Sequence, residues 1–289
     1  MGLDLFQCSP AARAVFERAE AARPGLQGLC FRGTAAALNA TVNTQPCLFA
    51  VDLACAQALI EAGVSPHGVA GFSLGEIPAV CVAGLLDEDQ GFDFVCRRAE
   101  AMQACGDRHP GVMFAVVRLS SDEVEALSRQ LGAVYPVNYN CPGQTVVACP
   151  AETGPALQAA VTNAGGKAIR LAVSGAFHSP LMDEAADALA RLVADIDFGE
   201  MTIPAYANLT GQPYDDPRAL LSQQVNHPVR WQATIERMIA DGFDTFVEVG
   251  PGRTLSGFIQ KIDGDVRVLN VCDAASLDQI VAALEVAHV

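Results

Sequence analysis

The sequence predicts an α/β protein in which a small subdomain is inserted into a larger one. Two observations predict this class: short apolar runs alternate with helix-like stretches along the chain, and the order of these periods changes between residues 112 and 173. With 289 residues and 51% hydrophobic content, the chain can bury the core of one large domain or two modest ones.

The inserted segment is defined by the order of its predicted elements. These are a strand at 112–118, a helix at 121–130, strands at 134–138 and 144–148, a helix at 155–164 and a strand at 167–173. The order β-α-β-β-α-β is that of the split βαβ, ferredoxin-like unit. We therefore predict a ferredoxin-like subdomain at 112–176 and a larger subdomain formed by 1–111 and 177–289.

A buried helix is expected before the first motif. Thr44 stands where an N-cap belongs, Pro46 lies in the first turn and Gly63 at the end. A short apolar run follows, so the motif that begins at Gly71 falls on a strand-to-helix turn.

Ser73 lies in this motif, Gly-Phe-Ser-Leu-Gly. Gly-x-Ser-x-Gly between a strand and a helix is typical of a nucleophile elbow, in which small neighbours allow a strained turn to expose the serine oxygen. The alternative is a serine that caps a buried helix. The motif alone leaves both open, because a nucleophilic serine also needs a base.

His178 is the strongest candidate for that base. It precedes a helix that Ser179 and Pro180 are expected to start, and the field at a helix N-terminus disfavours imidazolium. The ring would therefore stay neutral and able to accept a proton. The alternative is a histidine that packs or faces solvent.

Arg98 is a cation in an apolar stripe. In the helix expected after its cap Asp87, Arg98 lies four residues from both Phe94 and Met102 and shares their face. A buried guanidinium needs an anion, because an unpaired buried charge is too costly. That anion is either a protein carboxylate or the carboxylate of a ligand.

Several functional classes are excluded by composition. A net charge of −15, with Lys167 and Lys261 as the two lysines, excludes a nucleic-acid binder. Ten cysteines without a C-x-x-C pair, and scattered histidines, predict no disulfide framework and no metal site. "GPGRTLSG" lacks the spacing of a dinucleotide loop. No leader or membrane span is expected, which places the protein in the cytoplasm.

Six ordered motifs carry a resemblance to a known family. "GFSLGE", Arg98 followed by "AEAMQ", "NYNCPGQ", "GAFHSPLM", "QVNHPVRW" and "FVEVGPGRTLSG" resemble the malonyl-CoA:acyl carrier protein transacylases, and more distantly the acyltransferase domains of polyketide synthases. The resemblance runs from about Leu3 to Ile262. It implies an α/β-hydrolase-like large subdomain that carries a ferredoxin-like insert.

The resemblance also implies a role for each site residue. The nucleophile falls on Ser73 and the base on His178, with the Leu74 N–H in the oxyanion hole and Arg98 gripping the malonyl carboxylate. The remaining positions are Gln224, whose backbone carbonyl orients the histidine, Asn138 and Asn140 in the substrate cleft, and Phe177, whose ring favours malonyl over α-methyl substrates.

Two departures from the family pattern are visible. Phe72 stands where the family usually has histidine, which predicts altered packing at the elbow. The family also opens with an apolar strand and a Gly-Gln-Gly-Ser-Gln loop that supplies a second oxyanion donor, whereas this sequence begins with "MGLDLFQCSP". Slow acylation and exposed apolar surface are therefore expected of the chain as written.

The predicted function is malonyl transfer from malonyl-CoA to acyl carrier protein through a malonyl-serine, with no cofactor. Docking of an acidic carrier protein would need a local basic patch, for which Lys167, Arg170 and Arg253 are candidates. The alternatives are a serine thioesterase or esterase, and a catalytically weakened module that binds carrier protein. No distinguished acid lies between Ser73 and His178, where such hydrolases usually have one.

Overall fold

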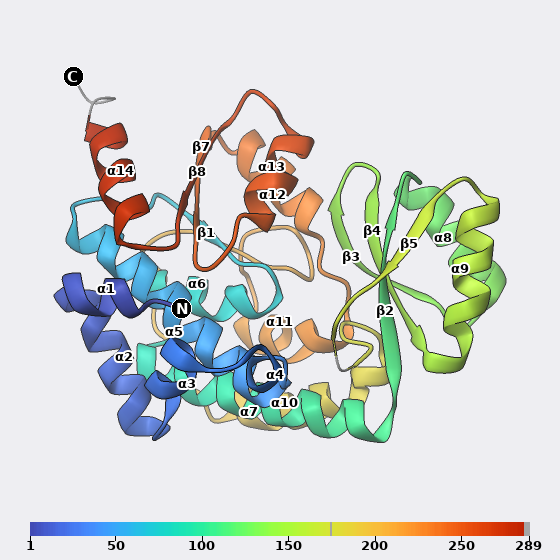
Figure 1. The fold of residues 1–289 in the computed structure, drawn as a ribbon, viewed down its shortest axis with the longest axis horizontal. Coiled ribbons are helices and arrows are strands. Elements are labelled where there is room, and N and C mark those ends of the chain that lie inside the picture. The colour runs from blue at the N-terminus through green and yellow to red at the C-terminus, as the bar shows by residue number, and fades with distance from the viewer. Residues whose placement is uncertain (174, 286–289) are drawn as a thin grey trace. The chain divides into compact units, whose positions relative to one another are not determined.

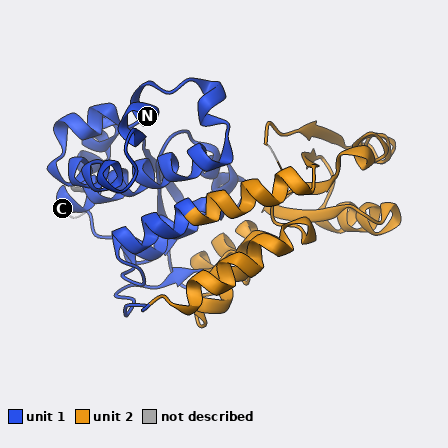
Figure 2. Cartoon of the chain, turned by 90° about the horizontal axis from the view of Figure 1, so that it is seen from below, with its two compact units in different colours: residues 1–96, 197–206, 241–289 blue, residues 97–196, 207–240 orange. Residues whose placement is uncertain are grey.

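The computed structural model describes residues 1–173 and 175–285, which fall into two compact units. Unit 1 comprises Met1–Cys96, Asp197–Tyr206 and the chain from Asp241 onward, and unit 2 comprises Arg97–Ile196 and Ala207–Ala240 (Figure 2). The subdomain boundaries expected from the sequence, 112–176 within 1–111 and 177–289, stay a prediction. Ser174 and residues 286–289, which belong to those ranges, lie outside the described residues.

Unit 1 combines helices with two small parallel sheets (Figure 1). β1 pairs with β6, Val69 opposite Ala205, and β7 pairs with β8, Thr245 opposite Arg267. Its elements are α1 (Leu3–Cys8), α2 (Pro10–Ala22), α3 (Leu26–Arg32), α4 (Ala35–Leu38), α5 (Thr41–Glu61), β1 (Val69–Ala70), the 3-10 turn η1 (Ser73–Gly75), α6 (Glu76–Val82), the first part of α7 (Glu88–Arg108), β6 (Ala205–Tyr206), β7 (Thr245–Val249), α13 (Thr254–Ile262), β8 (Arg267–Val271) and α14 (Ala274–Glu285).

Helix α5 is buried, as predicted, but it begins earlier than predicted. Its first residue is Thr41, so Thr44 is a helical residue and not the N-cap, and Pro46 lies inside the helix. Proline has no N–H to donate to the carbonyl four residues earlier. The guanidinium of Arg23, the C-cap residue of α2, takes that place by donating to the Val42 carbonyl at 2.6 Å, so this carbonyl has a partner although the helix continues through the proline.

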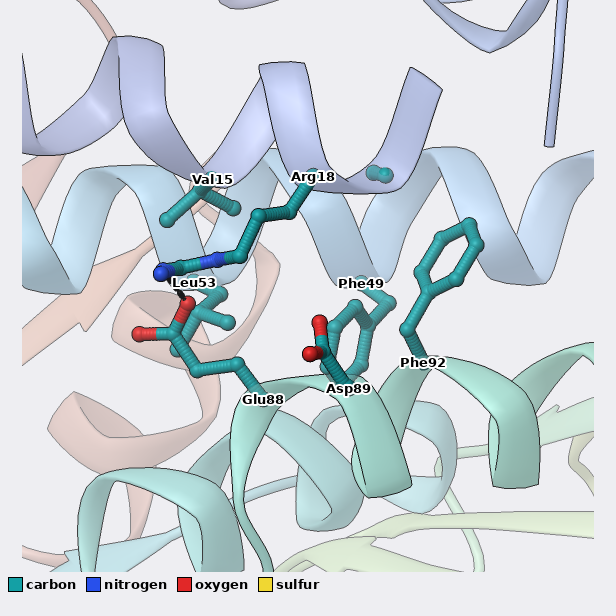
Figure 3. A pocket seen from close by; sticks show the side chains of 8 residues that line it. Val15, Arg18, Phe49, Leu53, Glu88, Asp89 and Phe92 are labelled. Carbon is teal, nitrogen blue, oxygen red and sulfur yellow. Dashed lines mark hydrogen bonds and ion pairs between the residues drawn. The ribbon is translucent and has the colours of Figure 1, made fainter. Parts of the chain in front are cut away.

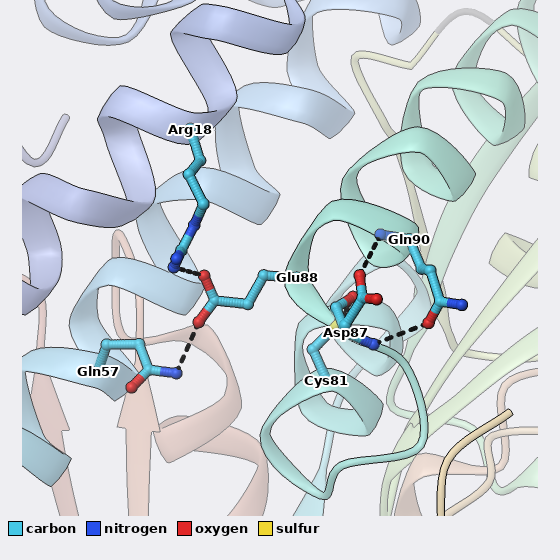
Figure 4. Close-up of polar contacts among 6 residues, drawn as sticks. All are labelled: Arg18, Gln57, Cys81, Asp87, Glu88 and Gln90. Carbon is cyan, nitrogen blue, oxygen red and sulfur yellow. Dashed lines mark hydrogen bonds and ion pairs between the residues drawn. The ribbon is translucent and has the colours of Figure 1, made fainter.

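Helix α7 begins where the sequence predicted. Asp87 Oδ1 accepts from the Gln90 N–H at 2.7 Å, and Gln90 Oε1 accepts from the Asp87 N–H at 2.9 Å, which is a reciprocal cap (Figure 4). The next residue, Glu88, pairs with Arg18 of α2 and accepts from Gln57 Nε2 of α5 at 3.0 Å. These polar contacts tie the start of α7 to two neighbouring helices.

A pocket in unit 1 lies where α2, α5 and α7 pack together (Figure 3). None of the predicted site residues belongs to this pocket. Its lining consists of apolar side chains, the Arg18–Glu88 pair and one further carboxylate: Val15, Arg18, Ala19, Phe49, Leu53, Glu88, Asp89 and Phe92. We assign this pocket to helix packing.

Unit 2 is built around one antiparallel sheet in the order β3-β4-β2-β5. All six elements expected between residues 112 and 173 are present, in the expected order. The unit comprises the second part of α7, β2 (Gly111–Val117), α8 (Ser121–Leu131), β3 (Tyr135–Cys141), β4 (Gln144–Pro150), the 3-10 turn η2 (Ala151–Thr153), α9 (Gly154–Asn163), β5 (Lys167–Arg170), the 3-10 turn η3 (Pro180–Met182), α10 (Asp183–Ala194), α11 (Pro217–Gln223), the 3-10 turn η4 (Gln224–Asn226) and α12 (Trp231–Ala240).

The central strand β2 is buried on both faces, which explains its continuous apolar sequence. Val112, Phe114 and Val116 pack with residues of α8 and α9, which lie beside the sheet in Figure 1. Met113 and Ala115 point to the other face and pack with residues that include Ala176 and Phe177. The segment that carries His178 is therefore held against the sheet by its two preceding residues.

The predicted α/β class is confirmed by these elements. Among the described residues, no helix combines the length and the apolar character needed to cross a membrane.

Candidate active site

Ser73 has a strained backbone. Its φ of +52° lies in the left-handed region, which non-glycine residues seldom adopt and which is frequent at functional sites. The residue belongs to η1, whose N-cap position is Phe72, and the N-cap of the following α6 is Gly75. Ser73 is thus the first residue of η1, and it occupies the N-cap position of neither η1 nor α6.

Gly71 is the glycine of the motif that the turn requires. A Cβ atom built on Gly71 would lie 1.9 Å from both the backbone carbon and the oxygen of Gly75, so no other residue fits there without a backbone shift. The same construction at Gly75 meets nothing within 4 Å. Close approach of the chain to itself at Gly71 thus forms the turn that carries Ser73.

The flanks of Ser73 are packed into unit 1. Leu74 is buried, and the ring of Phe72 lies 6.5 Å from that of Phe258 in α13, measured between centroids. Phe72 therefore makes an aromatic contact with α13, and packing altered relative to the family stays a prediction.

His178 is buried, with 3% of its surface exposed, and also has a positive φ of +61°. Its Nδ1 lies 2.8 Å from the Gln224 carbonyl oxygen, and its backbone N–H donates to the Val225 carbonyl at 2.8 Å. Since a carbonyl can only accept, Nδ1 carries the proton and Nε2 has the lone pair. Burial first, and then the nearby positive charge of Arg98, lower the pKa of His178 to about 4.

Arg98 is buried on α7, with 1% of its surface exposed. Phe94 and Met102, one turn to either side, are buried as well, so the predicted burial of this face is confirmed. One amino group of the guanidinium donates to Gln224 Oε1 at 2.7 Å. The acceptor in this contact is a neutral amide.

Gln224 is the residue on which both contacts converge. It is the first residue of η4 and is 2% exposed. Its backbone carbonyl holds His178 and its side chain holds Arg98. Sequence reasoning assigned the carbonyl contact through the family resemblance but missed the side-chain contact, because positions 98 and 224 share no sequence period.

Asn138 and Asn140 lie on β3 and are buried. β3 is joined to the chain after η4, because the Tyr139 N–H donates to the Val229 carbonyl at 2.9 Å and the Val229 N–H donates to the Val137 carbonyl at 2.8 Å. Within the described part of the chain, Oδ1 of each asparagine has no hydrogen-bond partner. A buried acceptor without a donor is costly, so these two oxygens suit the N–H groups of a ligand.

The structure thus brings three predicted site residues into contact in unit 2: Arg98, His178 and Gln224. Asn138, Asn140 and Phe177 belong to the same unit, where Phe177 is half-buried against the sheet. Ser73 and Leu74 belong to unit 1.

One group of potential metal ligands was missed by sequence reasoning because its members are distant in the chain. Cys105 lies in the last turn of α7, His109 directly follows that helix and Glu184 is on α10, with their ligand atoms within 4.8 Å of one another. Glu184 is already bound by Arg108 Nε at 2.8 Å and by His109 Nε2 at 3.0 Å. The adjacent guanidinium favours an ion-pair cluster over a cation site.

Comparisons with known proteins place this geometry in a family. The profile of the acyl transferase domain family matches residues 1–275. The malonyl CoA-acyl carrier protein transacylase of Bacillus subtilis is 32% identical over 294 residues, which cover 99% of this chain and 93% of that protein.

Two solved structures are similar over nearly their whole length. The malonyl CoA-acyl carrier protein transacylase of Clostridium perfringens has a TM-score of 0.96 and 33% identity, covering 100% of this chain and 93% of that chain. A malonyl-transacylase in complex with its type II polyketide synthase acyl carrier protein has a TM-score of 0.94 and 32% identity, covering 98% and 94%.

The turn at Ser73 predicts a large loss of stability on substitution of one of its two glycines and little change at the other. Gly71→Ala should lower the free energy of unfolding by more than about 3 kcal/mol, because its Cβ meets backbone rather than a movable side chain. The matched control Gly75→Ala, with φ −58° and open space, should change stability by less than about 1 kcal/mol. Urea unfolding measures both, and equal losses would contradict the assigned turn.

The buried imidazole predicts an unusual titration. Because the pKa is about 4 when folded and about 6.5 when unfolded, the unfolded chain binds more protons between these values, and the free energy of unfolding falls as the pH is lowered through that window. Between pH 6.5 and 4.5 we expect wild type to lose on the order of 2 kcal/mol more than His178→Gln. NMR titration that places His178 near pH 6.5 would contradict this.

Proposed function

The chain belongs to the acyl transferase domain family, and we propose that it transfers a malonyl group from malonyl-CoA to the phosphopantetheine thiol of an acyl carrier protein. The observation that carries this proposal is the buried guanidinium of Arg98, held in one hydrogen-bonded set with the buried, neutral His178. A thioester substrate with a free carboxylate needs a base and a cation, and these two residues provide them. The similarity to malonyl CoA-acyl carrier protein transacylases supports malonyl as the acyl group.

In the proposed first half-reaction, Ser73 is the nucleophile. Its Oγ bonds to the thioester carbonyl carbon while its proton moves to Nε2 of His178, and the Leu74 N–H stabilises the oxyanion. The carbon–sulfur bond then breaks, and the departing thiolate of coenzyme A takes the proton from His178. The strained backbone at Ser73 supports this role, since strain of this kind gathers at functional sites.

Arg98 is proposed to bind the malonyl carboxylate. A guanidinium and a carboxylate form two parallel charge-assisted hydrogen bonds, which fix both the position and the direction of the acyl chain. Burial of Arg98 strengthens this pairing, because little water competes. Phe177, which precedes the base, is proposed to limit the space beside the α-carbon.

In the second half-reaction the carrier protein's thiol takes the place of coenzyme A. His178 accepts the thiol proton, the sulfur attacks the malonyl-serine carbonyl, and Ser73 recovers its proton as the ester bond breaks. Both acyl carriers present the same phosphopantetheine arm, whose amide N–H groups suit the unpaired Oδ1 atoms of Asn138 and Asn140. Exposed Lys167 and Arg170 on β5 are proposed contacts for an acidic carrier protein.

Three further proposals concern the cofactor requirement, the cellular location and the subdomain boundaries. Acyl transfer between thioesters changes no oxidation state, and serine and histidine supply its nucleophile and base, so the reaction is proposed to need no cofactor. We propose the cytoplasm as its location. The strand order of unit 2 supports a ferredoxin-like subdomain at 112–176 inserted into an α/β-hydrolase-like one at 1–111 and 177–289.

Release of coenzyme A tests the proposal. With malonyl-CoA alone, wild type should release about one equivalent and gain about 86 Da, then continue only when holo acyl carrier protein is added. Ser73→Ala should gain no mass, whereas the exposed-serine control Ser120→Ala should behave like wild type. Steady release without carrier protein would show a thioesterase instead, and acylation of Ser73→Ala would show another nucleophile.

A further inference from the structure

We propose that the side-chain amide of Gln224 sets the acyl selectivity of the enzyme, by holding the guanidinium of Arg98 in place without neutralising its charge. The inference rests on the proposed function and names a positioning residue for it. It concerns the side chain of Gln224, as distinct from the backbone carbonyl that holds the base.

The contact joins two buried groups. Arg98 and Gln224 are 1% and 2% exposed, and their bond of 2.7 Å connects helix α7 to the turn η4 across 126 positions of sequence. An arginine side chain has four rotatable bonds and loses considerable freedom when it is fixed. A hydrogen bond at its far end fixes the plane of the guanidinium, and this plane decides whether a carboxylate can meet it with two bonds.

The amide of Gln224 is neutral, and this distinguishes it from a carboxylate as a partner of Arg98. A carboxylate at position 224 would also hold Arg98, but it would cancel the positive charge and the malonyl group would have to break a buried ion pair. The amide oxygen accepts a hydrogen bond from one of the five N–H donors of a guanidinium and leaves its net charge unchanged. Gln224 therefore fixes the direction of the Arg98 guanidinium and adds no negative charge beside it.

The base is held by a different part of the same turn. His178 Nδ1 donates to the Gln224 backbone carbonyl, and the His178 N–H donates to the Val225 carbonyl. The turn itself is anchored by Asn226 Nδ2, which donates to Asp183 Oδ1 at 2.9 Å. A change in the side chain of Gln224 should therefore alter recognition of the malonyl carboxylate and leave general-base catalysis in place.

Two substitutions separate these roles. Gln224→Met has a similar length and no acceptor of comparable strength, and Gln224→Glu has the same shape with a negative charge. The exposed neighbour Gln223→Met is the matched control. The single-turnover acylation rate of each is measured with malonyl-CoA and with acetyl-CoA over a range of pH, after urea unfolding shows that the variant is folded.

We expect Gln224→Met to lose roughly 10- to 100-fold in the acylation rate with malonyl-CoA and less than about 3-fold with acetyl-CoA, with an unchanged pH profile. Gln224→Glu should lose more malonyl activity than Gln224→Met, because it neutralises Arg98. Gln223→Met should match wild type. Should Met not fold, Gln224→Asn takes its place, because the shorter side chain withdraws the amide oxygen from Arg98 without adding a charge.

Equal losses for the two donors, or no loss for either, would overturn the inference while leaving the proposed function intact. A shift of the pH profile in Gln224→Met would also overturn it, because it would mean that the neutral side chain acts through His178; in Gln224→Glu a shift is expected, since neutralising Arg98 removes a charge that lowers the pKa of His178. Failure of wild type to react with malonyl-CoA would instead refute the proposed function, so the two failures are distinguishable.

Discussion

Burial of one positive charge is the constraint on which the proposed site depends. Arg98 lies on a helix face that is otherwise apolar, and such a charge is tolerated only where polar groups meet it. Gln224 meets it through an amide and meets His178 through its carbonyl. The same charge then helps to lower the pKa of His178 and keeps the ring neutral. The turn η4 thereby connects Arg98, the proposed carboxylate ligand, with His178, the proposed base.

Unit 1 shows a second constraint, which is steric. Gly71 permits the approach of the chain to Gly75, and the turn so formed leaves Ser73 with a positive φ. His178 shares that uncommon conformation, although it stands on a different element in unit 2. The packing of neighbouring residues offsets the backbone strain at both positions. Leu74, which follows Ser73, is buried, and Ala176 and Phe177, which precede His178, pack against the sheet.

Local signals in the sequence predicted much of this structure. Strand and helix periods predicted all six elements of the segment from 112 to 173, and Asp87 was identified as the cap of α7. The start of α5 was predicted wrongly, because Arg23, distant in sequence, satisfies the carbonyl that Pro46 leaves free. The Gln224 side-chain contact was missed for a similar reason: its partner lies 126 positions away. Periodicity reports the neighbours of a residue along one element, whereas these contacts join different elements.

The most direct test of the account is the acyl preference of Arg98→Ala, compared with the exposed neighbour control Arg97→Ala. The measurement is the ratio of single-turnover acylation rates with malonyl-CoA and acetyl-CoA, on variants shown to be folded. If Arg98 receives the substrate's carboxylate, malonyl transfer should weaken by about 2 to 5 kcal/mol while acetyl transfer is spared or improved, and Arg97→Ala should match wild type. An equal loss for both acyl groups in Arg98→Ala would contradict the account and indicate that Arg98 has a structural role.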